Sequence, residues 1–274
     1  MFDVATAALS RAILPMAEDG GGFHGPTIAD FFPPAIFGEG TFYEFNRVMM
    51  VRLIATAVLV MLFLLASRNL RLVPSRGQSI AEMALDFVRV NIAEEVLGKE
   101  RGKSWVPLLT VIFFAVFAMN ITGVIPGLNI AGSSVVGFPL VVAVVAWIAF
   151  MVAGIRAHGA LHFFREQIFP PGVPWPLYFI LAPIELVSTF VLRPLTLTIR
   201  LLANMMSGHF ILVLAFAATN ALFLEASLAM KPLGLLTWGA SIAFYGLEVF
   251  IAALQAYIFA LLTAVYISLS VEGH

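Results

Sequence analysis

The sequence contains no cysteine, which excludes disulfide bonds, cysteine-ligated zinc and thiol nucleophiles. Charged residues are scarce, at 11% of the 274 residues, and this scarcity excludes an ordinary soluble domain. The alternation of apolar and polar residues that is typical of a transmembrane β-barrel is also missing. Neither a Gly-x-Ser-x-Gly turn nor a His-Glu-x-x-His sequence occurs, so the common nucleophile and metal templates of enzymes are absent.

Long apolar runs make up most of the chain instead. Hydrophobic residues account for 61% of the sequence. Apolar stretches of about 20 residues or more recur, and this is the length that an α-helix needs to cross a bilayer. We therefore predict an all-α polytopic membrane protein with about five membrane-inserted helices and one amphipathic surface helix.

Charge and loop residues divide the chain into a lead-in and a membrane domain. Residues 1–46 combine acidic side chains with glycine and proline, so we expect a loop-rich extracytoplasmic lead-in. The apolar run near the N-terminus lacks a basic start, so we expect no cleaved signal peptide. A single membrane domain is expected over 47–274, with its first span at about 47–66. The segment that follows holds the densest group of Lys and Arg in the chain, which places it in the cytoplasm. Within it, the helical spacing of apolar residues over 79–97 indicates an amphipathic helix that lies on the membrane surface or against a partner, with a solvated helix packed on another loop as the alternative.

A helical hairpin is expected over about 105–155. Its first arm ends in a turn containing glycine and proline, and its second arm returns to a basic loop. His158 and His162 stand four residues apart in this loop, a spacing that suits a metal ion on a helix. Because no carboxylate motif accompanies them, we favour histidines at the membrane interface and predict no metal site.

The last two apolar stretches, at about 177–219 and 233–270, are about twice as long as a membrane span requires. A helix of about 40 residues measures about 60 Å, so it must tilt steeply or break. We predict a long tilted hairpin over about 177–270 that lies beside something large in the membrane. With one crossing for each stretch, the N-terminus lies outside and the C-terminus in the cytoplasm, in a multi-pass protein of the plasma membrane.

Ionisable and amide side chains interrupt this long hairpin. Arg200 lies within an apolar run, where a charge is costly and marks an ion path or a counter-charge, with a purely structural arginine as the alternative. Helical spacing puts Asn204 near Arg200 on one stripe. Antiparallel pairing places His209 and Glu248 in the same half of the hairpin, and Gln255 shares the face of Glu248. We interpret the histidine and the acid as a proton-exchanging pair open to the outside, with a buried structural ion pair as the alternative.

Arg200 differs from this pair because a guanidinium stays protonated and cannot carry protons. It acts as a fixed positive charge. A carboxylate that passes it would be held in its ionised form. The arginine thereby separates two access routes for protons.

These residues resemble subunit a of the rotary ATP synthases. The family pattern places an essential arginine before Leu, then Asn-Met and a small residue ahead of Gly, as in RLLANMMSGH at 200–209. The stretch LEVFIAALQAYIFALLTAVYISLS at 247–270 resembles the last helix of the family. The resemblance implies that Arg200 meets a carboxylate of a c-subunit ring, with Asn204 and Gln255 around it. It also implies that His209 and Glu248 serve an outer half-channel, although many family members carry the acid and the histidine on the opposite helices.

The resemblance further implies a non-catalytic stator subunit whose two aqueous half-channels and arginine couple proton translocation to ring rotation and ATP synthesis. The implied partners are the c-subunit ring, peripheral stalk b-type subunits, the rest of the ATP synthase complex and the lipid bilayer. No nucleic acid and no cofactor is implied. Glu185 and Arg193 are expected either in the inner half-channel or as anchors that snorkel to the interface. A secondary proton-coupled transporter is the alternative function.

Overall fold

Helices form almost all of the chain that the computed structural model describes, namely residues 34–37, 45–68, 75–128, 130–169, 177–224 and 230–272. The two short strands pair antiparallel with an irregular register. In chain order the elements are β1 (Ala35–Phe37), β2 (Phe45–Asn46), α2 (Arg47–Ser67), α3 (Arg76–Val88), a π-helical segment (Arg89–Glu94), α4 (Glu95–Leu97), α5 (Lys99–Ile121), α6 (Gly137–His158), α7 (Ala160–Ile168), α8 (Tyr178–Val187), a second π-helical segment (Ser188–Leu192), α9 (Arg193–Leu224) and α10 (Lys231–Glu272).

Five helices in the described ranges are long and apolar enough to cross a membrane. They are α2, α5, α6, the continuous stretch from α8 to α9, and α10. The last two contain 47 and 42 residues, about twice the length of a span. The predicted all-α fold with five spans and two long C-terminal helices is therefore confirmed. Most of the expected lead-in at 1–46 lies outside the described residues, and the tilt of the long helices stays a prediction.

The amphipathic stretch expected at 79–97 forms α3, the first π-helical segment and α4 without a break in helical structure. The Ser75 hydroxyl oxygen accepts a hydrogen bond from the backbone N–H of Gln78 at 3.4 Å, which caps the start of α3. Val88 and Ile92 are fully buried, whereas Ile80 and Met83 are exposed. The part of the apolar stripe around Val88 and Ile92 therefore packs against other residues of the chain, whereas the part around Ile80 and Met83 forms an exposed apolar surface.

The two arms of the shorter hairpin, α5 and α6, extend beyond the predicted limits. Helix α5 begins at Lys99 rather than near Trp105, because helical structure continues through polar residues that a hydropathy pattern does not detect. It ends at Ile121, before a turn in which Gly127 has a φ of 94°. This left-handed conformation favours glycine, which explains the residue at that position.

The chain groups into two compact units, to both of which α9 and α10 contribute. The first contains Met1–Val58, Ala118–Val135 and Ala203–Ala253, and the second contains Leu59–Phe117, Val136–Leu202 and Leu254–His274.

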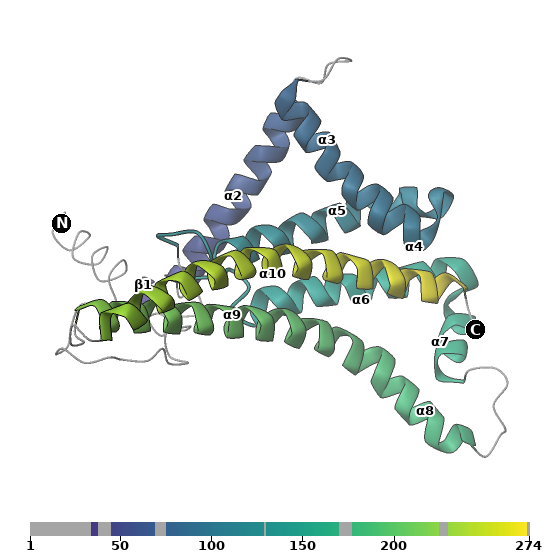
Figure 1. Cartoon of the computed structure of the whole chain (residues 1–274). Helices are drawn as coiled ribbons and strands as arrows, with labels where there is room; N and C mark the ends of the chain where they lie inside the picture. Colours follow the sequence, from purple (N-terminus) through teal and green to yellow (C-terminus); the bar gives the residue numbers. More distant parts are fainter. Residues whose placement is uncertain are drawn as a thin grey trace. The chain divides into compact units, whose positions relative to one another are not determined.

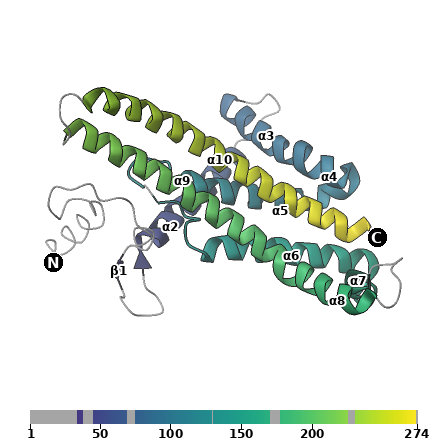
Figure 2. The same cartoon turned by 60° about the horizontal axis from the view of Figure 1, so that its bottom comes forward.

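Within the first unit, the end of α9 and the start of α10 form an antiparallel hairpin (Figures 1 and 2). The hydroxyl groups of Thr219 and Ser241 lie 3.2 Å apart in a buried hydrogen bond. Nearer the tip, a Cβ atom at Gly234 would lie 3.4 Å from the Leu222 side chain, so the two backbones approach closely there. The predicted pairing of these two helices is therefore confirmed in this unit.

Helix α2 holds the turn between α5 and α6 in place, also within the first unit. The Arg52 guanidinium donates hydrogen bonds to the carbonyl oxygens of Gly132 at 2.7 Å and Val135 at 3.0 Å. The Ser133 hydroxyl donates to Asn120 Oδ1 at 2.6 Å, and both side chains are fully buried. These bonds satisfy polar groups that would otherwise be costly inside an apolar fold.

The core of the second unit consists of small and branched side chains. Ala256, Ala260 and Ala264 form a buried stripe on α10 and share one cluster with residues of α5 and α6. Small residues at such an interface allow helices to approach closely, so their attraction comes from packing rather than from exclusion of water. Leu197 and Leu201 of α9 belong to the same cluster, and they fix which face of α9 points inward.

Candidate functional site

Arg200 lies on an exposed stripe of α9. The helix runs unbroken from Arg193 to Leu224, so the arginine stays inside a long apolar helix, as predicted. Arg200 and Asn204 are both exposed, as is Ser207, whose hydroxyl donates to the Ala203 carbonyl at 2.8 Å. The polar stripe that helical spacing predicts is therefore turned away from the interior of the chain.

No residue that the structure describes forms an ion pair with Arg200. A guanidinium at hydrocarbon depth needs a counter-charge, hydrogen-bond acceptors or water to be stable. In this chain the described side chains do not provide the counter-charge. The stripe around Arg200 is therefore suited to a partner outside the chain.

Glu248 has the opposite environment, because its side chain is only 4% exposed. Within the first unit it lies against α9: a Cβ atom at Gly208 would be 3.4 Å from Glu248 Oε1. Neither carboxylate oxygen has a hydrogen-bond partner among the described residues. A buried carboxyl group in this state is costly unless it carries a proton or contacts water, and such a group is suited to proton exchange.

His209 follows Gly208 on α9 and is partly buried. The hairpin therefore brings Glu248 against the turn of α9 that carries His209, as antiparallel pairing predicted. The glycine matters here because a larger residue at position 208 would occupy the space beside the Glu248 carboxylate.

Gln255 is buried, with 2% of its surface exposed, and it lies on the face of α10 that carries Ala252 and Ala256. Arg200 is exposed, so the two side chains differ in environment although the sequence interpretation grouped them together. The Gln255 side chain is therefore not part of the exposed stripe that carries Arg200.

Arg193 lies in an aromatic cradle in the second unit. Its guanidinium carbon stands 4.8 Å from the centre of the Phe150 ring and 5.5 Å from that of Tyr266, distances typical of cation–π contacts. Glu185 is partly buried and lies within electrostatic range of this guanidinium. The sequence interpretation identified the two charges but missed the two aromatic rings, which lie far from Arg193 in the sequence.

A second group of side chains was only half recognised from the sequence. His158 and His162 lie together as the spacing indicated, and Glu166 joins them from the following turn of α7. The missing carboxylate is thus supplied four residues after His162, a spacing that the sequence itself contains.

Together these features define a polytopic α-helical membrane protein whose two longest helices carry buried and exposed ionisable groups, an arrangement typical of proteins that move ions.

Residues 49–268 match the family of ATP synthase A chains. The chain is 48% identical over 251 residues to ATP synthase subunit a of Rhodococcus erythropolis (strain PR4 / NBRC 100887), which covers 92% of this chain and 91% of that protein. It is 37% identical over 260 residues to the subunit a of Pseudarthrobacter chlorophenolicus, covering 94% of this chain and 97% of that one. It is 32% identical over 257 residues to the subunit a of Streptomyces lividans, covering 93% and 90%.

The chain therefore belongs to the family of ATP synthase subunit a. It is a non-catalytic, multi-pass membrane subunit of a bacterial ATP synthase and serves proton transport in the membrane sector of that complex. The resemblance seen in the sequence is confirmed, and the transporter alternative is set aside.

Proposed function

We propose that this chain is the stator half of the proton path, in which Arg200 separates two aqueous half-channels and faces the carboxylates of a rotating c-subunit ring. The observation that carries the proposal is the exposed Arg200, which forms no ion pair with the described residues although it lies within an apolar helix. An isolated charge at this depth calls for a counter-charge from outside the chain. A ring of carboxylates provides one.

Electrostatics explains how Arg200 would act. Opposite charges about 4 Å apart attract by about 4 kcal/mol at an effective dielectric constant of about 20. That energy favours the ionised carboxylate over the protonated carboxyl group by about 1000-fold, since about 1.4 kcal/mol corresponds to a factor of ten in the equilibrium constant. A rotor carboxyl group must therefore release its proton before it reaches Arg200. Because the guanidinium itself keeps its proton, it blocks a direct leak between the half-channels.

His209 and Glu248 form the outer half-channel in this proposal. The burial of Glu248 against Gly208 and the lack of described hydrogen-bond partners for its oxygens support a group that takes up and releases a proton. An adjacent histidine exchanges protons near neutral pH. Asn204, on the exposed stripe, orients the passing carboxylate through its amide, and Gln255 supports α10 from inside the fold.

Glu185 belongs to the inner half-channel in this proposal, and Arg193 positions it. The aromatic contacts of Arg193 hold its guanidinium in one place. This supports a role in which Arg193 positions Glu185, rather than one in which the Arg193 side chain itself moves. The proposed partners are the c-subunit ring, the peripheral stalk b-type subunits, the rest of the ATP synthase complex and the surrounding lipid. The proposed orientation has the N-terminus outside and the C-terminus in the cytoplasm.

The test removes the positive charge of Arg200 while the ATP synthase complex stays assembled. Proton-driven ATP synthesis in membrane vesicles should fall by about 100-fold or more in Arg200→Ala, because the attraction estimated above is lost. Ile199→Ala provides the matched control, since this neighbour is exposed on the same helix and carries no charge. Subunit content measured after purification would show that assembly is preserved. Coupled synthesis at the control's level in Arg200→Ala would overturn the proposal.

A further inference from the structure

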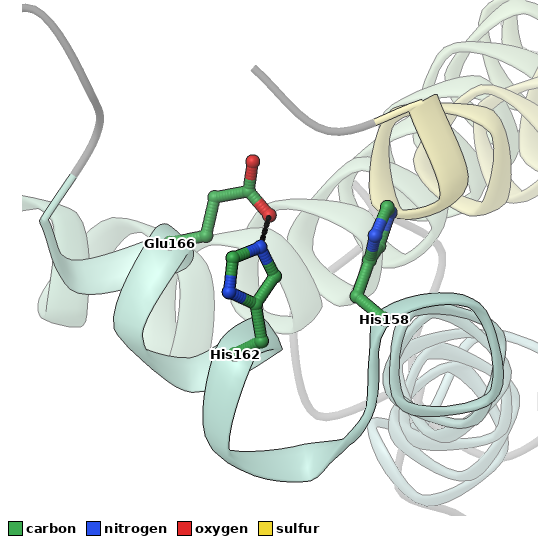
Figure 3. Close-up of side chains that lie close together, drawn as sticks. All are labelled: His158, His162 and Glu166. Carbon is green, nitrogen blue, oxygen red and sulfur yellow. Dashed lines mark ion pairs between the residues drawn. The ribbon is translucent and has the colours of Figure 1, made fainter.

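Three metal-ligating side chains of the second unit meet at the corner between α6 and α7. The potential ligand atoms of His158, His162 and Glu166 all lie within 4.8 Å of one another. Figure 3 shows His162 and Glu166 side by side on α7, with His158 facing them from the end of α6. No part of the proposed proton path uses these residues.

The fold of the corner brings the three side chains together. Helix α6 ends at His158 because Gly159 has a φ of 81°, a conformation that favours glycine, and α7 starts at the next residue. The Phe163 ring then packs directly over Gly154, where any Cβ atom would overlap it. The same ring lies edge-on to Phe150, with the ring centres 5.6 Å apart. These contacts fix the orientation of α7 relative to α6.

A hydrogen bond to the last turn of α10 selects one tautomer of the neutral His158 ring. Its Nε2 atom lies 3.0 Å from the carbonyl oxygen of Val271, in the last turn of α10. A carbonyl oxygen only accepts hydrogen bonds, so Nε2 carries the proton and Nδ1 of the neutral ring keeps its lone pair. A metal-binding histidine almost always donates its other ring nitrogen in this way, often to a backbone carbonyl.

His162 and Glu166 form an ion pair on α7 whose spacing is close to that of two ligands of one metal ion. His162 Nε2 and Glu166 Oε2 are 3.8 Å apart, beyond ordinary hydrogen-bond length. Two ligands of one tetrahedral zinc ion, each about 2.0–2.1 Å from the metal, stand about 3.3 Å apart. The His162 side chain is 67% exposed, so a small rotation can close the remaining gap.

We propose that His158, His162 and Glu166 bind a zinc ion. Two imidazoles and one carboxylate form a known zinc ligand set, with a water molecule as the fourth ligand. Calcium and magnesium prefer sites built from oxygen ligands alone, so they fit this set less well. The bound ion joins α6 to α7 and, through the hydrogen bond of His158, reinforces the contact with the end of α10.

The test measures zinc binding by the assembled complex, so its result does not depend on proton transport. The purified complex is stripped with a chelator, and Zn²⁺ uptake is followed by equilibrium dialysis and calorimetry. Wild-type complex should take up one more zinc ion per copy of this chain than His162→Ala or Glu166→Gln. Loss of an outer-shell partner alone weakens metal affinity by about 10–100-fold, so loss of a direct ligand should cost at least about tenfold.

Glu100→Gln is the matched control, because it removes a carboxylate of the same unit that is 93% exposed and distant in sequence from the cluster. It should bind zinc as the wild type does. Both test residues lie at a partly open corner of the fold, and circular dichroism of the purified variants checks that they stay helical. Equal zinc uptake by the wild type, His162→Ala and Glu166→Gln would overturn the proposal.

Discussion

Arg200 and Glu248 show how two ionisable residues in long apolar helices come to have different chemistry. Arg200 is exposed and can meet charge from another subunit, whereas Glu248 is enclosed by its own chain. A permanent charge on the surface suits electrostatic control of a passing group. A buried carboxyl group without described hydrogen-bond partners suits the exchange of a proton.

Glu248→Gln separates the proton-exchange role from a structural one. Glutamine has nearly the same shape but cannot exchange a proton, so proton conduction through the membrane sector should fall by about 100-fold or more while assembly persists. The thermal stability of the complex should not decrease, because the variant removes a carboxyl group that lacks described partners. Proton flux into vesicles and the melting temperature are the two measurements.

The matched control for this variant is Glu95→Gln, which makes the same change at an exposed position in α4. It should leave both quantities unchanged. A structural ion pair predicts the reverse pattern for Glu248→Gln, since breaking a buried pair costs about 3–5 kcal/mol. Conduction at the wild-type rate together with a lowered melting temperature would therefore contradict the proton-exchange role.

Among the helical elements, the corner between α6 and α7 depends on glycines at two positions, Gly154 and Gly159. Gly154 lies under the Phe163 ring, and this contact sets how α7 folds back on α6. In turn α7 contacts α8, so the corner also positions the start of the long α8–α9 stretch (Figure 2).

Gly154→Ala should destabilise this corner. The added methyl group would overlap the Phe163 ring, and overpacking of this kind costs about 1–3 kcal/mol. The comparison is Gly239→Ala in α10, where a Cβ atom meets nothing within 4 Å and alanine favours the helix by about 1 kcal/mol. Thermal unfolding of the purified complex should show a lower midpoint for Gly154→Ala and an unchanged or higher one for Gly239→Ala. Equal midpoints would mean that the corner adapts without cost.

At the scale of the whole molecule, the distribution of charge predicts the orientation in the membrane. The basic residues gather between α2 and α5 and again after α6, and this asymmetry predicts that these segments face the cytoplasm. The turn between α5 and α6 then faces outside. The absence of cysteine makes this prediction easy to test, because a single introduced thiol is the only one in the chain.

Two single-cysteine variants report on the two sides of the membrane: Lys103→Cys on the proposed cytoplasmic side and Ile125→Cys on the proposed outer side. Both positions are exposed in the structure. A thiol reagent that does not cross membranes, added to intact cells, should label Ile125→Cys and leave Lys103→Cys unlabelled until the cells are broken. Inverted vesicles should give the opposite result. Labelling of Lys103→Cys in intact cells would reverse the proposed orientation.

The features of this protein that depend on neighbouring residues alone were predictable from its sequence. The five spans follow from the length of the apolar runs. The extra length of the last two runs predicted that α8–α9 and α10 would each be about twice as long as a membrane span. Antiparallel pairing of neighbouring helices placed Glu248 near the turn that holds His209, because a hairpin leaves little choice of partner. The helix limits were less accurate, as the early start of α5 shows, because polar residues continue a helix beyond its apolar part.

The sequence by itself therefore determined the all-α membrane fold, the number of spans and the presence of Arg200, Glu248 and His209 within the long helices, since hydropathy and helical period depend only on neighbouring residues. Only the tertiary structure decided that Arg200 is exposed while Gln255 is buried, that Phe150 and Tyr266 enclose Arg193, and that His158 meets the His162–Glu166 pair beside the end of α10. The physical reason is that the inward face of a helix is set by packing against residues distant in the sequence, and periodicity alone does not specify which partner each face meets.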